Sequence, residues 1–225
     1  LNEEDLRFLY EIDSKIQSFG YGSDPRVKEM LDKRTDIRAD LVLATGYKPE
    51  EISFKEKEAL SGNIRFHYRD LVLDGVKSTE GLTLPESIGG GLYLDSLTST
   101  EGLILPKSIS KNLSFENLTS AKGLILPEDI GGSLHLNKLT SAKGLTLPKS
   151  IGGDLDLSKL TSAKGLILPD NIGGDFYLIN LISAKGLTLP ESVEGALDLS
   201  SLISAEGLTL PDNIGGNLVL TGLTS

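Results

Sequence analysis

Leucines alternate with other residues in short stretches from about residue 71 to the end of the chain. Each stretch has the form Leu-x-Leu, as at 145–147 and 155–157. Such alternation is typical of a short β-strand that buries one of its faces. The first leucines of successive stretches lie alternately 10 and 11 residues apart, so a pair of stretches returns every 21 residues. We therefore expect a mostly β repeat solenoid, in which each coil adds one short strand to each of two parallel sheets that face each other across an apolar core.

Glycine, proline and serine return with the same period and mark the corners of the coil. Glycine pairs, as at 152/153 and 173/174, are expected to adopt positive φ. A proline follows each first Leu-x-Leu stretch, and since proline cannot donate a backbone hydrogen bond it is expected to close the first strand. A serine near each opposite corner, as at Ser141 and Ser162, is expected to satisfy backbone groups through its hydroxyl. A residue that recurs in every coil is better explained by geometry than by catalysis.

Residues 1–62 lack this repeat and show helical spacing of apolar residues, so we expect a helical N-terminal cap there and the solenoid over residues 63–225. The cap is expected to cover the open end of the first coil. The helical elements expected are a helix at 3–18, a second from Asp24-Pro25 to about Arg34, a short turn at Pro49, and a helix that starts at the capping-box pattern Ser53-x-x-Glu56 and ends before Gly62.

The repeat carries a partial family resemblance. The segment 163–171, Ala-Lys-Gly-Leu-Ile-Leu-Pro-Asp-Asn, resembles the leucine-rich repeat pattern L-x-x-L-x-L-x-x-N. The 10-plus-11 nesting over residues 71–225 is similar to a bacterial 21-residue leucine-rich repeat subclass, sometimes called IRREKO. Asparagine occupies the final position only at Asn171 and Asn213, and the other repeats carry Ser or Asp. The resemblance implies a protein-interaction scaffold, either curved into a horseshoe or flatter.

Composition narrows the classes of partner. The net charge is −10, and residues 71–225 hold ten Lys and no Arg against 17 Asp and Glu. This balance argues against nucleic acid as a partner, because phosphate binding needs a basic stripe. No apolar run approaches the roughly 20 residues of a membrane-spanning helix. The chain has no cysteine, which rules out disulfides and Cys-ligated metals but is compatible with the cytoplasm and with secretion.

The candidate binding site is the outward face of the second strand, because this face differs from coil to coil on a copied frame. We expect it to bind a protein or peptide that carries Lys or Arg, with aromatic residues as anchors and carboxylates steering the encounter. The residues expected to take part are Tyr93, Glu116, His135, Asp154, Asp156, Asp175, Tyr177 and Asp198. The outward face of the first strand varies less, and it carries Thr83, Ile104, Ile125, Thr146, Ile167, Thr188 and Thr209.

Several alternatives remain beside this hypothesis. The varied face can reflect neutral change on a rigid spacer or surface stalk without a ligand. Asp154, Asp156 and Asp175 suit a loose Ca²⁺ site or a carboxylate pair, which would fit a polysaccharide-active β-solenoid enzyme. The Thr/Ile row fits an ordinary sheet surface, and ice binding, the alternative for such a row, would favour two outward threonines per coil. We assign no catalytic residue, cofactor or metal. The chain stops inside a repeat, so end-to-end self-association through an uncapped last coil is also expected.

Overall fold

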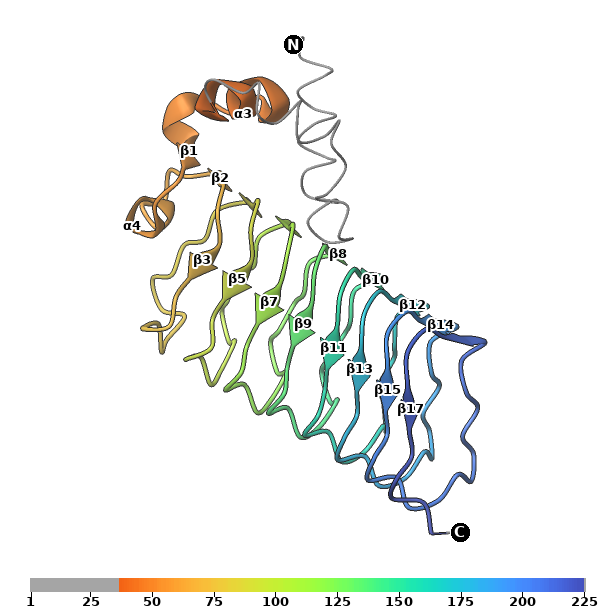
Figure 1. Ribbon diagram of the computed structural model, residues 1–225. Helices are drawn as coiled ribbons and strands as arrows, with labels where there is room; N and C mark the ends of the chain where they lie inside the picture. The colour runs from red at the N-terminus through yellow and green to blue at the C-terminus, as the bar shows by residue number, and fades with distance from the viewer. Residues whose placement is uncertain (1–36, 225) are drawn as a thin grey trace, which may run out of the picture.

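The computed structural model describes residues 37–224, and these form a parallel β-solenoid that follows a short helical segment. Successive coils stack along one axis, so the molecule is elongated (Figure 1). Two sheets of very short strands run the length of the stack, one with nine strands and one with eight. The expected fold class is therefore confirmed.

Each coil contributes one strand to each sheet. Sheet A contains β1 (Ile52–Ser53), β2 (Phe66–His67), β4 (Ser87–Ile88), β6 (Ser108–Ile109), β8 (Asp129–Ile130), β10 (Ser150–Ile151), β12 (Asn171–Ile172), β14 (Ser192–Val193) and β16 (Asn213–Ile214). Sheet B contains β3 (Leu71–Val72), β5 (Leu92–Tyr93), β7 (Leu113–Ser114), β9 (Leu134–His135), β11 (Leu155–Asp156), β13 (Phe176–Tyr177), β15 (Leu197–Asp198) and β17 (Leu218–Val219).

The strands pair in parallel, and in the repeats each residue lies beside the residue 21 positions away. Leu155, for example, is paired with Leu134 on one side and with Phe176 on the other. Equivalent side chains therefore form straight rows along the solenoid, about 4.8 Å apart from one coil to the next. The period of the sequence thus becomes a set of parallel rows on the surface and in the core.

The core is a continuous stack of leucines with a few larger or branched residues. In the central coil Leu155, Leu157 and Leu160 are all fully buried. Phe115 and Phe176 take leucine positions in other coils and are also fully buried. Burying each such side chain contributes about 1.5–3 kcal/mol relative to leaving it exposed, so stacking of coils is the main source of stability.

The predicted position of the first strand was wrong. The stretch 145–147 pairs with no neighbouring coil, and the sheet A strand begins after Pro148, at Ser150–Ile151. Proline provides no N–H and restricts the residue before it to extended backbone, so the Leu-x-Leu stretch is extended without joining a ladder. Proline therefore precedes the strand instead of closing it. Sheet A lies along one edge of the molecule beside the face of sheet B, and so the expected pair of facing sheets is not what forms (Figure 1).

The expected role of the glycine pairs was also wrong. Positive φ belongs to the single glycines of the other corner, such as Gly144 at +83°. The pairs lie where neighbouring coils approach closely: a Cβ on Gly152 would stand 2.3 Å from the carbonyl oxygen of Gly131. Ser110 and Glu194 occupy the position of Gly152 in two other coils, so the close approach does not require glycine in every coil.

The serine corner behaves as predicted. The hydroxyl oxygen of Ser141 accepts a hydrogen bond from the backbone N–H two residues later, at 3.2 Å, and six other coils repeat this contact. The serine holds the turn that leads into the positive-φ glycine.

The segment before the repeats is a small cap. It contains α3 (Ile37–Thr45), η2 (Pro49–Glu51) and α4 (Glu56–Ala59). The range 1–62 was expected to be helical, but β1 lies within it and joins sheet A. Ala59 packs into the main core beside the first coil. The turn at Pro49 is confirmed.

The prediction of a capping box at Ser53 was wrong, because Ser53 lies in β1 and its hydroxyl forms a hydrogen bond with His67 Nδ1 at 2.8 Å. The helices expected at 3–18 and 24–34 lie outside the described residues.

Candidate functional site

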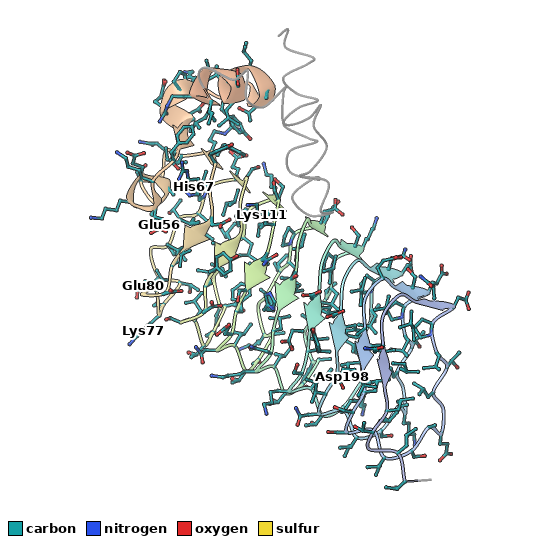
Figure 2. All side chains as sticks on the ribbon, viewed as in Figure 1. Glu56, His67, Lys77, Glu80, Lys111 and Asp198 are labelled. Atoms are coloured by element: carbon teal, nitrogen blue, oxygen red, sulfur yellow. The ribbon has the colours of Figure 1, made fainter. Side chains whose placement is uncertain are left out.

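The outer face of sheet B carries one row of side chains that changes at every coil. In order along the sheet this central row is Tyr93, Ser114, His135, Asp156, Tyr177, Asp198 and Val219, and the pairing register places each beside the next. The leucine or phenylalanine that precedes each of these residues fixes the backbone beneath the row; it is fully buried in every coil except the last, where Leu218 is partly buried. Sheet B occupies the front of the molecule in Figure 1, and Asp198 is labelled on it in Figure 2.

A second row, two residues earlier in each coil, joins neighbouring coils. Asp154 Oδ1 accepts a hydrogen bond from the backbone N–H of Asp175 at 2.7 Å, and Asp175 Oδ1 accepts from the N–H of Ala196 at 2.7 Å. Asp70, Asn112 and Ser133 make the same contact to the next coil. We call this set the cross-coil row. The structure thus gives Asp154 and Asp175, expected as binding residues, a structural contact as well.

Tyr177 is tied to the cross-coil row by its hydroxyl. Its phenolic O–H donates to Asp175 Oδ2 at 2.7 Å. This hydrogen bond is the main cause that raises the pKa of Tyr177 to about 12, and nearby carboxylates add to the effect. The same bond, after the one from the Ala196 N–H, holds the pKa of Asp175 below its ordinary value. The ring of Tyr177 is half-buried and held in one orientation on the face of the sheet.

The remaining carboxylates of the face make local contacts. Asp156 Oδ1 accepts from the backbone N–H of Ser158 at 2.9 Å, and Asp198 Oδ1 accepts from that of Ser200 at 2.9 Å. Glu116 is exposed. These three carboxylates are accessible at the edge or centre of the face, and they give it a negative potential.

Tyr93 and His135 are both half-buried members of the central row. Burial is the main cause that raises the pKa of the Tyr93 hydroxyl above its ordinary value. Ser114, which sequence reasoning did not select, lies between them and is almost fully buried. Its hydroxyl donates to Asp95 Oδ1 at 2.5 Å, and Asp95 also accepts from the backbone N–H of Glu116. The only signal in the sequence for the contact between Ser114 and Asp95 was that a small residue stands between Tyr93 and His135 in this row.

The arrangement does not assemble a proton relay. Ser114, His135 and Asp156 lie on adjacent strands, but the Ser114 hydroxyl is directed to Asp95 and Asp156 Oδ1 to Ser158. The structure does not bring Asp154, Asp156 and Asp175 together as a metal-binding group, and within residues 37–224 no three His, Asp or Glu side chains are placed to hold a metal ion. No helix in that range has the length and apolar character needed to cross a membrane.

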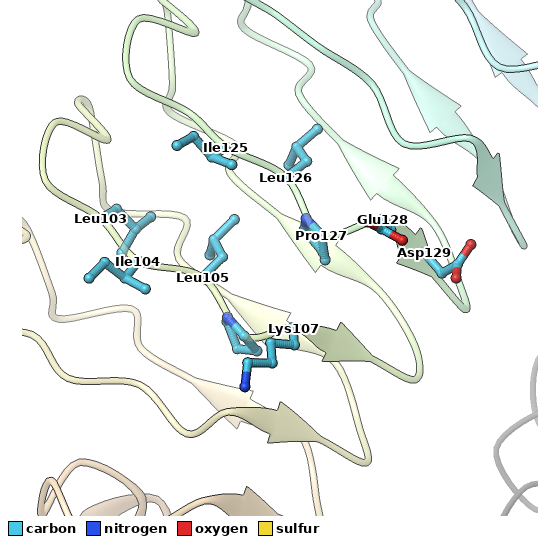
Figure 3. Close-up of a pocket in the computed structure, with 10 residues that line it drawn as sticks. Leu103, Ile104, Leu105, Lys107, Ile125, Leu126, Pro127, Glu128 and Asp129 are labelled. Atoms are coloured by element: carbon cyan, nitrogen blue, oxygen red, sulfur yellow. The ribbon is translucent and has the colours of Figure 1, made fainter.

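The unpaired Leu-x-Leu side of the coils is grooved. One groove of about 540 Å³ lies between two coils and is lined by Leu105, Pro106, Leu126 and Pro127 among others (Figure 3). It forms where the backbone has no ladder to close the space between coils. The isoleucines expected to point outward on this side do so, as Ile104 is 82% exposed.

Comparison with protein-family models, with curated proteins and with solved structures gives no match for this chain.

Proposed function

We propose that the chain is a noncatalytic, leucine-rich-repeat-like scaffold that binds a protein or peptide through the outer face of sheet B. The observation that carries this proposal is the central row. From His135 through Asp156 and Tyr177 to Asp198, neighbouring strands present a different side chain at each step, while the residues beneath are leucine or phenylalanine throughout. A rigid frame with a non-repeating surface provides a distinct pattern of contacts along an extended partner.

The chemistry of the face favours a partner with Lys or Arg next to an apolar or aromatic group. Tyr93 and Tyr177 provide ring surface, and aromatic residues commonly anchor interfaces. Asp156, Asp198 and Glu116 provide charge that steers a cationic partner. Asp154 uses one carboxylate oxygen within the protein and Asp175 uses both, so their main part in binding would be to hold the sheet and the Tyr177 ring.

One observation favours a second candidate function, a rigid spacer without a ligand. The cross-coil row shows that polar side chains on this face also bind neighbouring coils to each other. If the protein is a spacer, no partner contacts the central row, and the variation of its side chains plays no part in recognition.

Selection of a displayed random peptide library on the intact protein tests the two candidates. Peptides enriched on the wild-type chain are measured by fluorescence anisotropy against Tyr177→Ala and Asp156→Asn, with Thr146→Ala on the opposite side as the matched control. We expect peptides rich in Lys, Arg and aromatic residues, a weaker affinity for the first two variants and no change for the control. Failure to enrich any peptide, or equal binding to all variants, would favour the spacer.

Self-association is a separate partner proposal. In a polypeptide that ends at residue 225, the last coil leaves Leu210 42% exposed and leaves β16 and β17 at the outer edges of their sheets. Unpaired strand edges are templates for another chain. Light scattering over a concentration series should then show association, and a constant monomer mass would exclude it.

A further inference from the structure

Two large apolar side chains lie next to each other in water on the unpaired side of the coils. Ile104 is 82% exposed and Ile125, on the next coil, is 78% exposed. Thr83 and Thr146 take the same position on the coils before and after them, and both are exposed. We call the surface of these four coils the Thr/Ile face, which comprises residues 80–86, 101–107, 122–128 and 143–149. Adjoining apolar side chains on an exposed face commonly mark an interaction surface.

Charged residues flank the Thr/Ile face on both sides, three positions before and three positions after each Thr or Ile. The first coil has Glu at both positions, and the fourth coil has Lys at both. The second coil has Glu before and Lys after, and the third has Lys before and Glu after. In coil order these residues are Glu80 and Glu86, Glu101 and Lys107, Lys122 and Glu128, and Lys143 and Lys149. The order of charges therefore becomes its own complement when the four coils are taken in reverse.

The apolar residues and the charges after them belong to one surface. Ile104, Lys107, Ile125 and Glu128 all line the groove of about 540 Å³ between the second and third coils (Figure 3). Thr146 and Lys149 line the next groove along the stack together. All eight charged residues are exposed except Glu86, which is half-buried. A partner that covers the isoleucines would therefore also meet these charges.

Most of these charges have no ion-pair partner within the part of the chain that the structure describes. Between residues 37 and 224, only Glu86 and Lys107 of this face form ion pairs, with each other at 2.9 Å and between Glu86 and Arg65 at 2.8 Å. Lys122 and Lys143, by contrast, occupy equivalent positions on adjacent coils. Like charges on neighbouring coils repel, so an opposing surface with the reverse order of charges would relieve this repulsion.

A second copy of the same chain provides that surface. In a two-fold dimer whose axis lies in the interface and follows the groove between the second and third coils, the two solenoids run antiparallel. Every charged position then faces a charge of opposite sign. The opposed residues are Glu80 and the partner's Lys143, Glu86 and the partner's Lys149, Glu101 and the partner's Lys122, and Lys107 and the partner's Glu128. Symmetry makes each of these contacts twice.

The apolar positions match under the same symmetry. Ile104 faces the partner's Ile125, and Thr83 faces the partner's Thr146. The two isoleucines that are most exposed in the single chain thus cover each other at the centre of the interface. Because both surfaces belong to the same chain, the spacing between coils is equal on the two sides whatever its value.

Other two-fold arrangements of the same face oppose like charges. If the axis moves by half a coil in either direction, Glu101 or Lys122 faces its own copy. If it moves by a whole coil, Lys122 faces the partner's Lys143 or Glu80 faces the partner's Glu101. If the axis runs along the stack, Glu80 faces the partner's Glu86. Like charges opposed across an interface disfavour association, so the charge pattern selects one register.

We infer that the Thr/Ile face is an antiparallel two-fold interface with a second copy of this chain. Six steps of extended backbone and four coil widths give a footprint of about 20 by 19 Å, or about 400 Å² on each chain. Interfaces of this size are typical of weak, transient complexes, so we expect a dissociation constant in the high micromolar range. The interface uses neither the central row nor the last coil, and so it is independent of the function proposed for sheet B and of end-to-end association.

Exchange of charges between the two middle coils tests the interface by sedimentation velocity. Glu101→Lys/Glu128→Lys makes all four charges of these coils positive, and Lys107→Glu/Lys122→Glu makes all four negative. We expect each variant alone to self-associate at least tenfold more weakly than the wild type. An equimolar mixture of the two should form a heterodimer at least as tight as the wild-type dimer, which also shows that both variants are folded.

The matched control is Glu191→Lys/Glu206→Lys, which makes the same change at exposed positions of the same two rows but beyond the four coils. It should change the affinity less than twofold. A wild-type chain that stays monomeric at millimolar concentration, or a mixture that fails to associate, would overturn the inference. Unchanged association of both charge variants would assign self-association to another surface, such as the last coil, and would overturn it as well.

Disulfide cross-linking tests the register, since the chain has no cysteine of its own. A mixture of Thr83→Cys and Thr146→Cys should give a covalent dimer between the two variants. Neither variant alone should do so, because each position is separated from its own copy by three coil steps, about 14 Å along the stack. The mixture of Thr83→Cys with Thr188→Cys is the control out of register. Equal cross-linking in all samples, or none in the first mixture, would contradict the proposed interface.

Discussion

Replacing Asp154 by alanine should destabilise the solenoid through a single lost contact between coils. Asp154 Oδ1 accepts the backbone N–H of Asp175 at 2.7 Å, at a point where the ladder of sheet B has not yet begun. Hydrogen bonds to charged groups contribute about 1.5–3 kcal/mol, and the half-buried position of Asp154 favours the lower end of that range. We expect a loss of about 1.5 kcal/mol, which for a chain of this size lowers the melting temperature by about 3–6 °C.

Matched variants separate this contact from a general effect of removing an aspartate. Asp170→Ala makes the same chemical change at an exposed position of another row, and it should cost less than about 0.5 kcal/mol. Asp154→Asn keeps an acceptor oxygen, as Asn112 does in its own coil at 2.9 Å, so we expect an intermediate loss of about 0.5 kcal/mol.

Urea unfolding followed by far-UV circular dichroism gives these free energies, and hydrogen exchange of the Asp175 amide gives a local measurement. The amide should exchange faster in Asp154→Ala than in the other variants. If Asp154→Ala and Asp170→Ala unfold at the same urea concentration and the amide exchanges at its wild-type rate, the cross-coil row does not stabilise the stack.

Three further predictions concern other side chains of the repeats. Tyrosinate absorbance should show Tyr177 titrating near pH 12, and Asp175→Asn should return its pKa toward 10; the hydrogen bond then contributes stability below pH 10 that is lost as pH rises through 12. An NMR titration should place the pKa of Glu86 at about 2, because Arg65 and then Lys107 hydrogen-bond to its carboxylate, so the contribution of these bonds is present above its ordinary pKa of 4.5 and is lost as pH falls through 2. Leu155→Asp, which buries an unpaired charge, should cost several kcal/mol, whereas Asp156→Leu on the outer face, which loses only its local hydrogen bonds to Ser158, should cost much less.

The buried positions of the coil could be predicted from leucine periodicity, but the hydrogen-bonded positions could not. The leucines at 145–147 and 155–157 alternate in the same way, and both stretches contribute to one core. Only the second joins a ladder. Alternation reports which face of an extended backbone is buried, and it does not report whether a neighbouring backbone lies within hydrogen-bond distance. The proline was the available signal, because it cannot donate and restricts the residue before it.

At the candidate site, too, the orientation of side chains could be predicted from the sequence and their hydrogen bonds could not. The outward orientation of Asp156 and Tyr177 follows from the alternation and is what the structure shows. The contact of Asp154 with the next coil depends on the offset between a side-chain oxygen and a backbone N–H 21 residues away, which a sequence pattern does not contain.

The direction of the sheet hydrogen bonds has a mechanical consequence. They run along the stacking axis, so tension between the first and last coils loads the ladders in peeling mode, one rung at a time. Each rung that opens releases a coil of 21 residues, an extended length of about 70 Å, while the coils behind it keep their pairing. Pulled in this direction, the protein would lengthen in equal increments and dissipate force gradually, whereas a sheet loaded in shear would resist and then fail in one event.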